Sequence, residues 1–216
     1  MALWGGTDAN ETKPQWLTSD QQKQVYATAQ GWVAEPGLSG NSNTSATPEI
    51  LVAFKNLAGT DAAPSSGLGL ADITEIEFIT TAVAADTPAA FSVRVRFNEE
   101  VDVTGNPTVT VTNSGQGTST AAHLTCPYAS GTGTNELVFT DAGWSAGECL
   151  NTNVLYVGAD SVALAGGTIK DKGTTTNTLI SALADVGYHG GVNRGGDIAA
   201  DGSTIELGGP RAIVLA

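Results

Sequence analysis

The residues best suited to chemistry in this sequence are two groups of carboxylates. Glu99, Glu100 and Asp102 stand close together in one segment, and Asp197 precedes the pair Asp201-Gly202 near the C-terminus. Carboxylate-rich loops can bind calcium, because Ca²⁺ prefers oxygen ligands. Neither group has the alternating ligand pattern of an EF-hand loop. We therefore expect solvated turn carboxylates on an acidic surface, with calcium binding as the open alternative.

Thiol and imidazole groups are too few to predict a metal site. The chain has two cysteines, Cys126 and Cys149, and two histidines, His123 and His189, with no CxxC pair. The two cysteines either form a disulfide, which would stabilise the fold by about 3 kcal/mol, or remain two buried thiols, as a reducing compartment favours. His123 alternates within a strand-like run and is expected at the surface or an interface.

Sequence motifs of catalysis and nucleotide binding do not occur. There is no GxSxG, GxxxxGK[ST] or HExxH, and the glycine clusters never complete GxGxxG. Nothing places a nucleophile beside a base. We predict that the protein is not an enzyme, with no catalytic residues, no metal and no cofactor.

The clearest structural signal is the segment FSVRVRFNEEVDVTGNPTVTVTN, residues 91–113. Its first half alternates between apolar and polar side chains, which predicts a strand with one buried face: Phe91, Val93, Val95 and Phe97 on that face, and Ser92, Arg94 and Arg96 on the other. Residues 102–106 contain turn residues, and Val109 and Val111 alternate with threonines after Pro107. The segment therefore predicts a β-hairpin.

The rest of the chain supplies further strand signals. Thr18 or Ser19 can cap a short helix that Gly31 ends. Two apolar runs, 31–35 and 49–57, are expected to form a pair of strands, and 59–69 has the composition of a linker. Short strands are expected at 74–80, 121–126, 136–140, 154–157, 161–164 and 179–183, and AGGTIKDKG is interpreted as a turn. Such spacing is typical of a two-sheet sandwich.

Composition excludes two classes of partner. With 9 basic against 22 acidic residues among 216, the formal net charge is -13, which argues against nucleic-acid binding. No stretch approaches the ~20 apolar residues of a membrane span. The beginning of the sequence lacks the features of a secretory signal, so a route out of the cell by lysis, inside a virus particle, is the expectation.

Three strings carry a resemblance to a known module. VRVRFNEEVDVTGNPTVTVTN, YASGTGTNELVFT and VLYVGADSVALAGGTIKDKG resemble, in this order, the bacterial Ig-like repeats of large surface adhesins. The resemblance covers roughly Ile73 to Leu183 and implies an Ig-like β-sandwich. Only a single copy occurs, whereas adhesins string many copies together, so a long stalk is not expected.

The N-terminal portion resembles a different group. MALWGGTDANETKPQWL, VYATAQGWVAEPG and PEILVAFKNLAG are similar to the N-terminal portion of virion structural proteins of tailed marine and cyanobacterial phages. This resemblance implies a protein made in the host cytoplasm and located in the virion, with its Ig-like module on the outer surface of capsid or tail. It names no catalytic residues.

These inferences predict a mainly β protein in three parts. Residues 1–70 form an arm and attachment unit containing one short helix, 71–185 form an Ig-like β-sandwich, and 186–216 form a tail that packs back on the attachment unit or on a neighbour. The candidate partner-interface residues are large apolar side chains, although Trp32, like Trp144, is also expected in the core: Trp4, Trp16, Trp32, Ile213, Val214 and Leu215.

The predicted function is that of a capsid decoration or cement protein. It would bind the major capsid protein or other virion proteins, through lattice contacts or as a homo-oligomer, and display the sandwich. Deleting Met1 to Leu17 is then expected to abolish particle binding and leave the sandwich folded. A tail, neck or fibre component is the alternative. A second alternative is an adhesin domain that binds a host surface glycan, with no nucleic-acid or membrane partner.

Overall fold

We describe the protein from a computed structural model of the 216-residue chain. The structure describes residues 13–14, 16–18, 21–22, 24–36, 43, 45–59, 68, 70–79, 90–114, 123–145, 147–150, 153–157, 161–175 and 212–215. Several predicted features lie outside these ranges: Trp4, the strand at 179–183, His189, Asp197 and Asp201.

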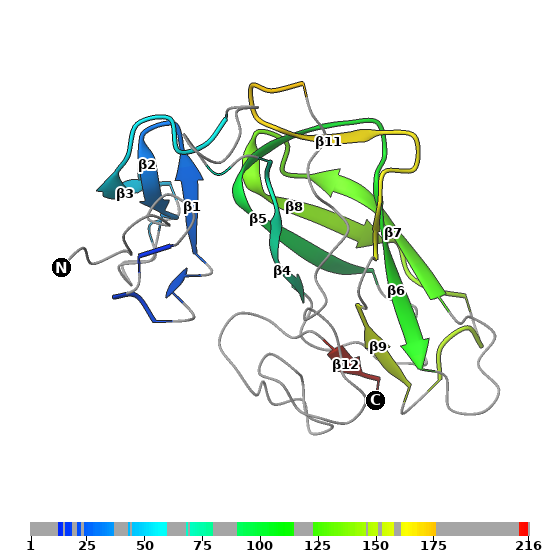
Figure 1. The fold of residues 1–216 in the computed structure, drawn as a ribbon. Helices are drawn as coiled ribbons and strands as arrows, with labels where there is room; N and C mark the ends of the chain where they lie inside the picture. Colours follow the sequence, from blue (N-terminus) through cyan, green and yellow to red (C-terminus); the bar gives the residue numbers. More distant parts are fainter. Residues whose placement is uncertain are drawn as a thin grey trace.

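The fold is mainly β, as the sequence predicts, and it is built as a β-sandwich beside a smaller N-terminal β unit (Figure 1). The N-terminal unit holds β1 (Val25–Thr28), β2 (Gly31–Ala34) and β3 (Glu49–Ala53). The strands of the sandwich are β4 (Ile73–Phe78), β5 (Phe91–Thr104), β6 (Thr108–Ser114), β7 (His123–Ser130), β8 (Thr134–Asp141), β9 (Val154–Tyr156), β10 (Val162–Ala163), β11 (Thr168–Asp171) and β12 (Ala212–Val214).

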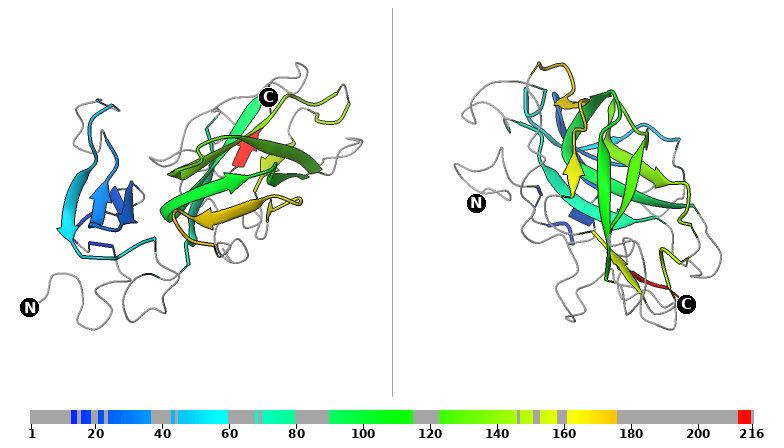
Figure 2. Two further views of the ribbon diagram at one scale, coloured as in Figure 1. Left: turned by 90° about the horizontal axis from the view of Figure 1, so that it is seen from above. Right: turned by 90° about the vertical axis from the view of Figure 1, so that its right-hand side faces the viewer.

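Strand pairing divides the sandwich into two layers. In the first layer β5 is central and pairs antiparallel with β4, β8 and β11. In the second layer β6 pairs antiparallel with β7, β9 and β10, and β12 adds to β9. β7 also pairs with β8, so the layers are joined along one side. The left-hand view of Figure 2 shows the N-terminal unit to one side of the sandwich.

Alternation along the strands produces the sandwich core. Phe91, Val93, Val95 and Phe97 of β5 are all buried, as predicted, and meet Val109 and Val111 of β6 in one apolar cluster. The ring of Trp144 packs on Phe91, with the ring centroids 6.1 Å apart. Each large apolar side chain buried in this way contributes about 1.5–3 kcal/mol. The period-two pattern therefore explains the main core.

The predicted hairpin at residues 91–113 is wrong. β5 and β6 are both present, but they belong to different layers, and the turn after Thr104 crosses from one layer to the other. β4 and β11 pair along one edge of β5, and β8 pairs along the other edge. Both edges of β5 are therefore occupied by other strands. β11, which arises from the segment interpreted as a turn, occupies the end of β5 where the hairpin partner was expected.

The N-terminal unit is an antiparallel meander with a small core of its own. β2 pairs with β1 and with β3, which confirms the predicted strand pair. A second cluster of buried side chains fills this unit, with Val25, Trp32, Val52 and Leu57 among its members. β1 also makes a parallel bridge to the sandwich, in which Ala27 is paired with Glu99 of β5. The two units therefore meet at β1 and β5.

The predicted helix is reduced to about one turn. The backbone N–H of Gln21 donates to Thr18 Oγ1 at 3.2 Å, and the N–H of Thr18 donates to Gln21 Oε1 at 3.0 Å, a reciprocal capping box. Thr18 thus acts as the predicted N-cap. Of the described residues that follow, only Gln21 and Gln22 are helical, and Val25–Thr28 is a strand. Pairing with β2 and β5 prevails over the local helix signal there.

Residues 212–215 belong to the sandwich. β12 pairs with β9, the N–H of Leu215 donates to the carbonyl of Asn153 at 2.9 Å, and the Leu215 side chain lies in the sandwich core. For these residues the expectation of a tail that packs back on the attachment unit is wrong, because they pack in the sandwich. The open edge of β9 gives the strand a partner within the same chain.

Candidate functional site

The densest group of charged side chains lies where the two units meet. We call Glu35, Glu77, Arg94, Arg96 and Glu136 the ionic cluster. Glu35 directly follows β2, whereas the other four project from β4, β5 and β8 of the sandwich. β5 and its neighbours present these residues on the face opposite the apolar core, because side chains alternate between the two faces of a strand.

Arg96 is the centre of the ionic cluster. Its Nη1 lies 3.2 Å from both carboxylate oxygens of Glu35, and its Nη2 lies 2.8 Å from Glu136 Oε1. Its Nε lies 3.4 Å from Glu77 Oε1, an oxygen that also accepts a hydrogen bond from Arg94 Nε at 2.6 Å. A single guanidinium thus joins the N-terminal unit to two strands of the sandwich.

Burial makes these interactions strong and costly to break. The side chains of Glu77 and Arg96 are almost completely buried. Burial alone would lower the pKa of Arg96, but Glu35, Glu136 and Glu77 together raise it, so the guanidinium stays charged. Burial also raises the pKa of Glu136, against the opposing effect of Arg96. Removal of one partner would leave buried charge without compensation.

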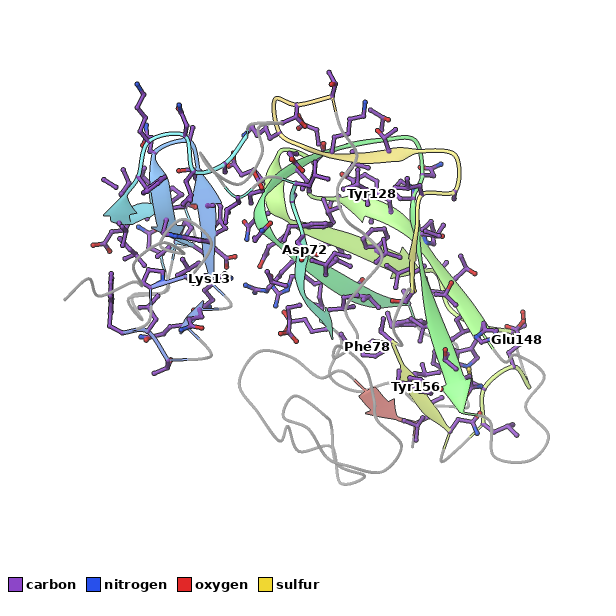
Figure 3. All side chains as sticks on the ribbon, in the orientation of Figure 1. Lys13, Asp72, Phe78, Tyr128, Glu148 and Tyr156 are labelled. Atoms are coloured by element: carbon purple, nitrogen blue, oxygen red, sulfur yellow. The ribbon has the colours of Figure 1, made fainter. Side chains whose placement is uncertain are left out.

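Lys13, labelled in Figure 3, adds a further cation near the ionic cluster, since Glu35 and Arg96 both influence its pKa. Its Nζ donates to the carbonyl of Gln22 at 2.6 Å. Burial lowers its pKa to about 8, although Glu35 and Glu75 act in the opposite direction. The junction therefore holds several charged groups that sequence reasoning did not single out.

A cavity of about 540 Å³ opens beside the ionic cluster. We call it the junction cavity, and it is lined from both units by Gln24, Tyr26, Glu35, Pro36, Arg94, Arg96, Glu100, Thr134, Asn135 and Glu136. Asn135 Nδ2 donates to Glu35 Oε1 at 2.8 Å, which fixes the wall between β8 and the end of β2. Burial, with Glu100 and Glu35 nearby, raises the pKa of Tyr26 to about 12, so its phenol keeps the proton. The side chains that line the junction cavity are mainly polar.

Glu99 does not behave as a solvated turn carboxylate. It is 1% exposed, and its Oε2 accepts a hydrogen bond from the N–H of Gly59 at 2.9 Å. Burial raises its pKa to about 7, the Gly59 hydrogen bond lowers it, and Asp171 raises it further. A signal was present in the sequence, since Glu99 falls in the same alternating phase as Phe97 and Val101. Glu99 was expected among the turn carboxylates, so the alternation was not extended to it.

Among the predicted interface residues, Trp16 and Trp32 differ in their exposure to solvent. Trp16 is 49% exposed. Trp32 is buried in the core of the N-terminal unit, so its interface role is wrong and its core role is confirmed. Leu215 is likewise buried and unavailable, whereas Ile213 and Val214 lie in β12 and pair with Leu155 and Val154 of β9. Trp4 lies outside the described residues.

The two cysteines are free thiols. Cys126 on β7 and Cys149 are both buried in the sandwich core, and no disulfide joins them. Burial raises the pKa of Cys126 to about 12 and that of Cys149 to about 11. Of the two alternatives that the sequence leaves open, the pair of buried thiols is the one observed. His123, at the start of β7, is exposed.

Within the described ranges, no group of three or more His, Cys, Asp or Glu side chains is arranged to hold a metal ion. The same part of the chain contains no helix that is long and apolar enough to span a membrane. No protein-family model matches the sequence, and neither a curated protein nor a solved structure matches it.

Proposed function

We propose that this protein is a non-catalytic structural component of a virus particle, most specifically a capsid decoration or cement protein. In this proposal the N-terminal unit attaches to the coat lattice, and the sandwich projects from the outer surface. The observation that carries the proposal is the open edge of β3. In the described part of the chain β3 pairs with β2 alone, and Ile50 on this strand is 47% exposed.

An unpaired strand edge is a natural place for another chain to bind. Its free N–H and C=O groups can pair with an added strand, and natural proteins usually protect such edges with charge, proline or a covering segment. Trp16 belongs to the same unit and exposes a large apolar surface of the kind that is common at the centre of interfaces. These features support attachment through the N-terminal unit.

The mechanism would be the burial of surface across neighbouring coat subunits. A protein that binds only the assembled shell stabilises that shell by mass action. The buried ionic cluster around Arg96 supports this role, because it would hold the sandwich in a fixed position relative to the attached N-terminal unit. The resemblance of residues 1–17, 25–37 and 48–59 to virion structural proteins of tailed phages points to the same partner.

A matched pair of substitutions tests the proposal. Ile50 and Ile79 are similarly exposed, at 47% and 43%, but Ile79 follows β4 of the sandwich. Added to purified particles that lack the protein, the Ile50→Lys variant should bind at least about tenfold more weakly than wild type, because a lysine would disturb a desolvated contact. Ile79→Lys should bind normally. Equal binding by both variants, measured by co-sedimentation, would contradict attachment through β3.

A tail, neck or fibre component remains the second candidate, since it could use the same open edge. Copy number separates the two, because a lattice protein follows the abundance of the coat protein and a tail part follows the symmetry of the tail. Quantitative mass spectrometry of purified particles gives this ratio. A small copy number would favour the tail, and absence from the particles would refute both candidates.

A further inference from the structure

The junction cavity has the size of a ligand-binding site and is formed by both units. Its volume of about 540 Å³ lies within the range of about 300–1,000 Å³ that is usual for small-molecule pockets. Tyr26 and Glu35 come from the N-terminal unit, whereas Arg94, Arg96 and Glu136 come from the sandwich. The cavity exists only because the two units are held together.

The charges of the lining are nearly balanced. Two guanidinium groups, of Arg94 and Arg96, stand against three carboxylates, of Glu35, Glu100 and Glu136. The remaining small excess is negative, and the whole chain carries a formal net charge of -13. An anionic ligand is therefore disfavoured, and the two guanidinium groups disfavour a metal cation. The chemistry that fits best is a neutral ligand rich in polar groups.

The side chains that line the cavity include both hydrogen-bond donors and acceptors, which is the combination that a ligand hydroxyl group needs. Carboxylates accept hydrogen bonds, guanidinium groups donate them, and a hydroxyl can do both. Glu136 Oε1 is buried against Arg96 Nη2 at 2.8 Å, but the Glu136 side chain as a whole remains 28% exposed. A ligand hydroxyl in the cavity could donate to the exposed part of this carboxylate. Tyr26 and Pro36 add a small apolar surface on the side of the N-terminal unit.

We propose that the junction cavity binds a neutral saccharide unit, with its hydroxyl groups hydrogen-bonded to Glu136 and neighbouring polar side chains. This inference goes beyond the attachment role and does not depend on it. It places a glycan site between the two units, and not on the sandwich alone.

Ligand-observed NMR on the full chain tests the choice of ligand. The probes are neutral disaccharides of glucose, galactose and N-acetylglucosamine, with a sialylated trisaccharide and a sulfated disaccharide as anionic comparisons. At least one neutral probe should bind with a Kd of about 1 mM or tighter, and the anionic probes should bind more weakly. Failure of every neutral probe, or tighter binding of the anionic ones, would overturn the proposal.

Two matched pairs of variants test the location. Gln24 lines the cavity, while its backbone bonds to Gln21 and Glu35 do not require its side chain. Gln24→Trp should therefore block binding of the neutral probe, and Gln24→Ala should leave most of it. Glu136→Gln should weaken binding about tenfold, because a hydrogen bond to a charged group is lost, whereas Glu49→Gln on the exposed start of β3 should have no effect.

Thermal unfolding of each variant shows whether the fold is retained. If Glu136→Gln fails to fold, the Gln24 pair still decides the location, since neither of its variants removes a member of the ionic cluster. Unchanged affinity in Gln24→Trp would place the saccharide elsewhere and refute a site in the junction cavity.

Discussion

Arg96 Nη1 lies 3.2 Å from both carboxylate oxygens of Glu35, so the outer face of β5 is tied to the residue that follows β2. The two residues are 61 positions apart in the sequence. This contact makes the N-terminal unit and the sandwich interdependent.

Replacement of Arg96 by methionine should destabilise the protein strongly. The substitution keeps an extended side chain but leaves Glu35, Glu77 and Glu136 without their shared cation. Breaking a buried ion pair in this way usually costs about 3–5 kcal/mol. Chemical denaturation of the wild type and Arg96→Met measures the difference in the free energy of unfolding.

Lys172→Met is the control for this prediction. Lys172 Nζ lies 2.9 Å from Glu100 Oε2, but the lysine side chain is about half exposed. Loss of such a surface pair should cost about 1 kcal/mol or less. Similar losses in Arg96→Met and Lys172→Met would show that the ionic cluster does not hold the junction.

Glu99 should make the stability of the protein fall as pH rises from about 4.5 to about 7. Below this range the carboxyl is protonated in both the folded and the unfolded state. Between pH 4.5 and 7, Glu99 loses its proton in the unfolded state but keeps it in the folded state, because burial raises its folded-state pKa from 4.5 to about 7. A shift of this size lowers the free energy of unfolding by about 3 kcal/mol above pH 7.

Glu99→Gln removes this titration and retains an oxygen that can accept the Gly59 hydrogen bond. The variant should therefore match wild type near pH 4.5 and exceed its stability above pH 7, as measured by denaturation across that range. Glu100→Gln, in which only the pair with Lys172 is lost, should show no such gain. A constant difference between Glu99→Gln and wild type at all pH values would contradict the prediction.

Gly31→Ala should disrupt the N-terminal unit. Gly31 has φ +129, and a Cβ atom there would lie 2.0 Å from the carbonyl oxygen of Val52 in the adjacent strand. Both the backbone conformation and the contact are unfavourable, so we expect a loss of at least about 2 kcal/mol. Gly166 also has a positive φ, +83, but a Cβ there would meet nothing within 4 Å. Gly166→Ala should cost only about 1 kcal/mol, and equal costs would argue against the close approach.

The thiols of Cys126 and Cys149 should be unreactive in the native protein. Both are buried and have a raised pKa, and the thiolate is the form that reacts. Treatment with iodoacetamide at neutral pH should leave both unmodified, whereas denaturation should allow both to be alkylated. An intact mass lower by two hydrogen atoms than that of the reduced chain would instead indicate a disulfide.

The alternating pattern of the sequence by itself determined much of the sandwich core. Phe91, Val93, Val95 and Phe97 on β5 and Val109 and Val111 on β6 are buried as predicted, because period-two alternation specifies which face of a strand is apolar. The capping box at Thr18 was equally local, since both of its hydrogen bonds lie within three residues. Such signals depend only on neighbours in the sequence.

Only the tertiary structure decided which strands pair and what covers the outer face of β5. Turn residues after Thr104 suit a hairpin and a crossover equally well, so the separation of β5 from β6 depends on which strands compete for the edges of β5. Arg96 lies on the polar face of its strand, yet it is buried because the distant Glu35 is brought against it. Long-range packing buries Arg96 at the centre of the junction, and the alternation of the sequence carries no information about such contacts.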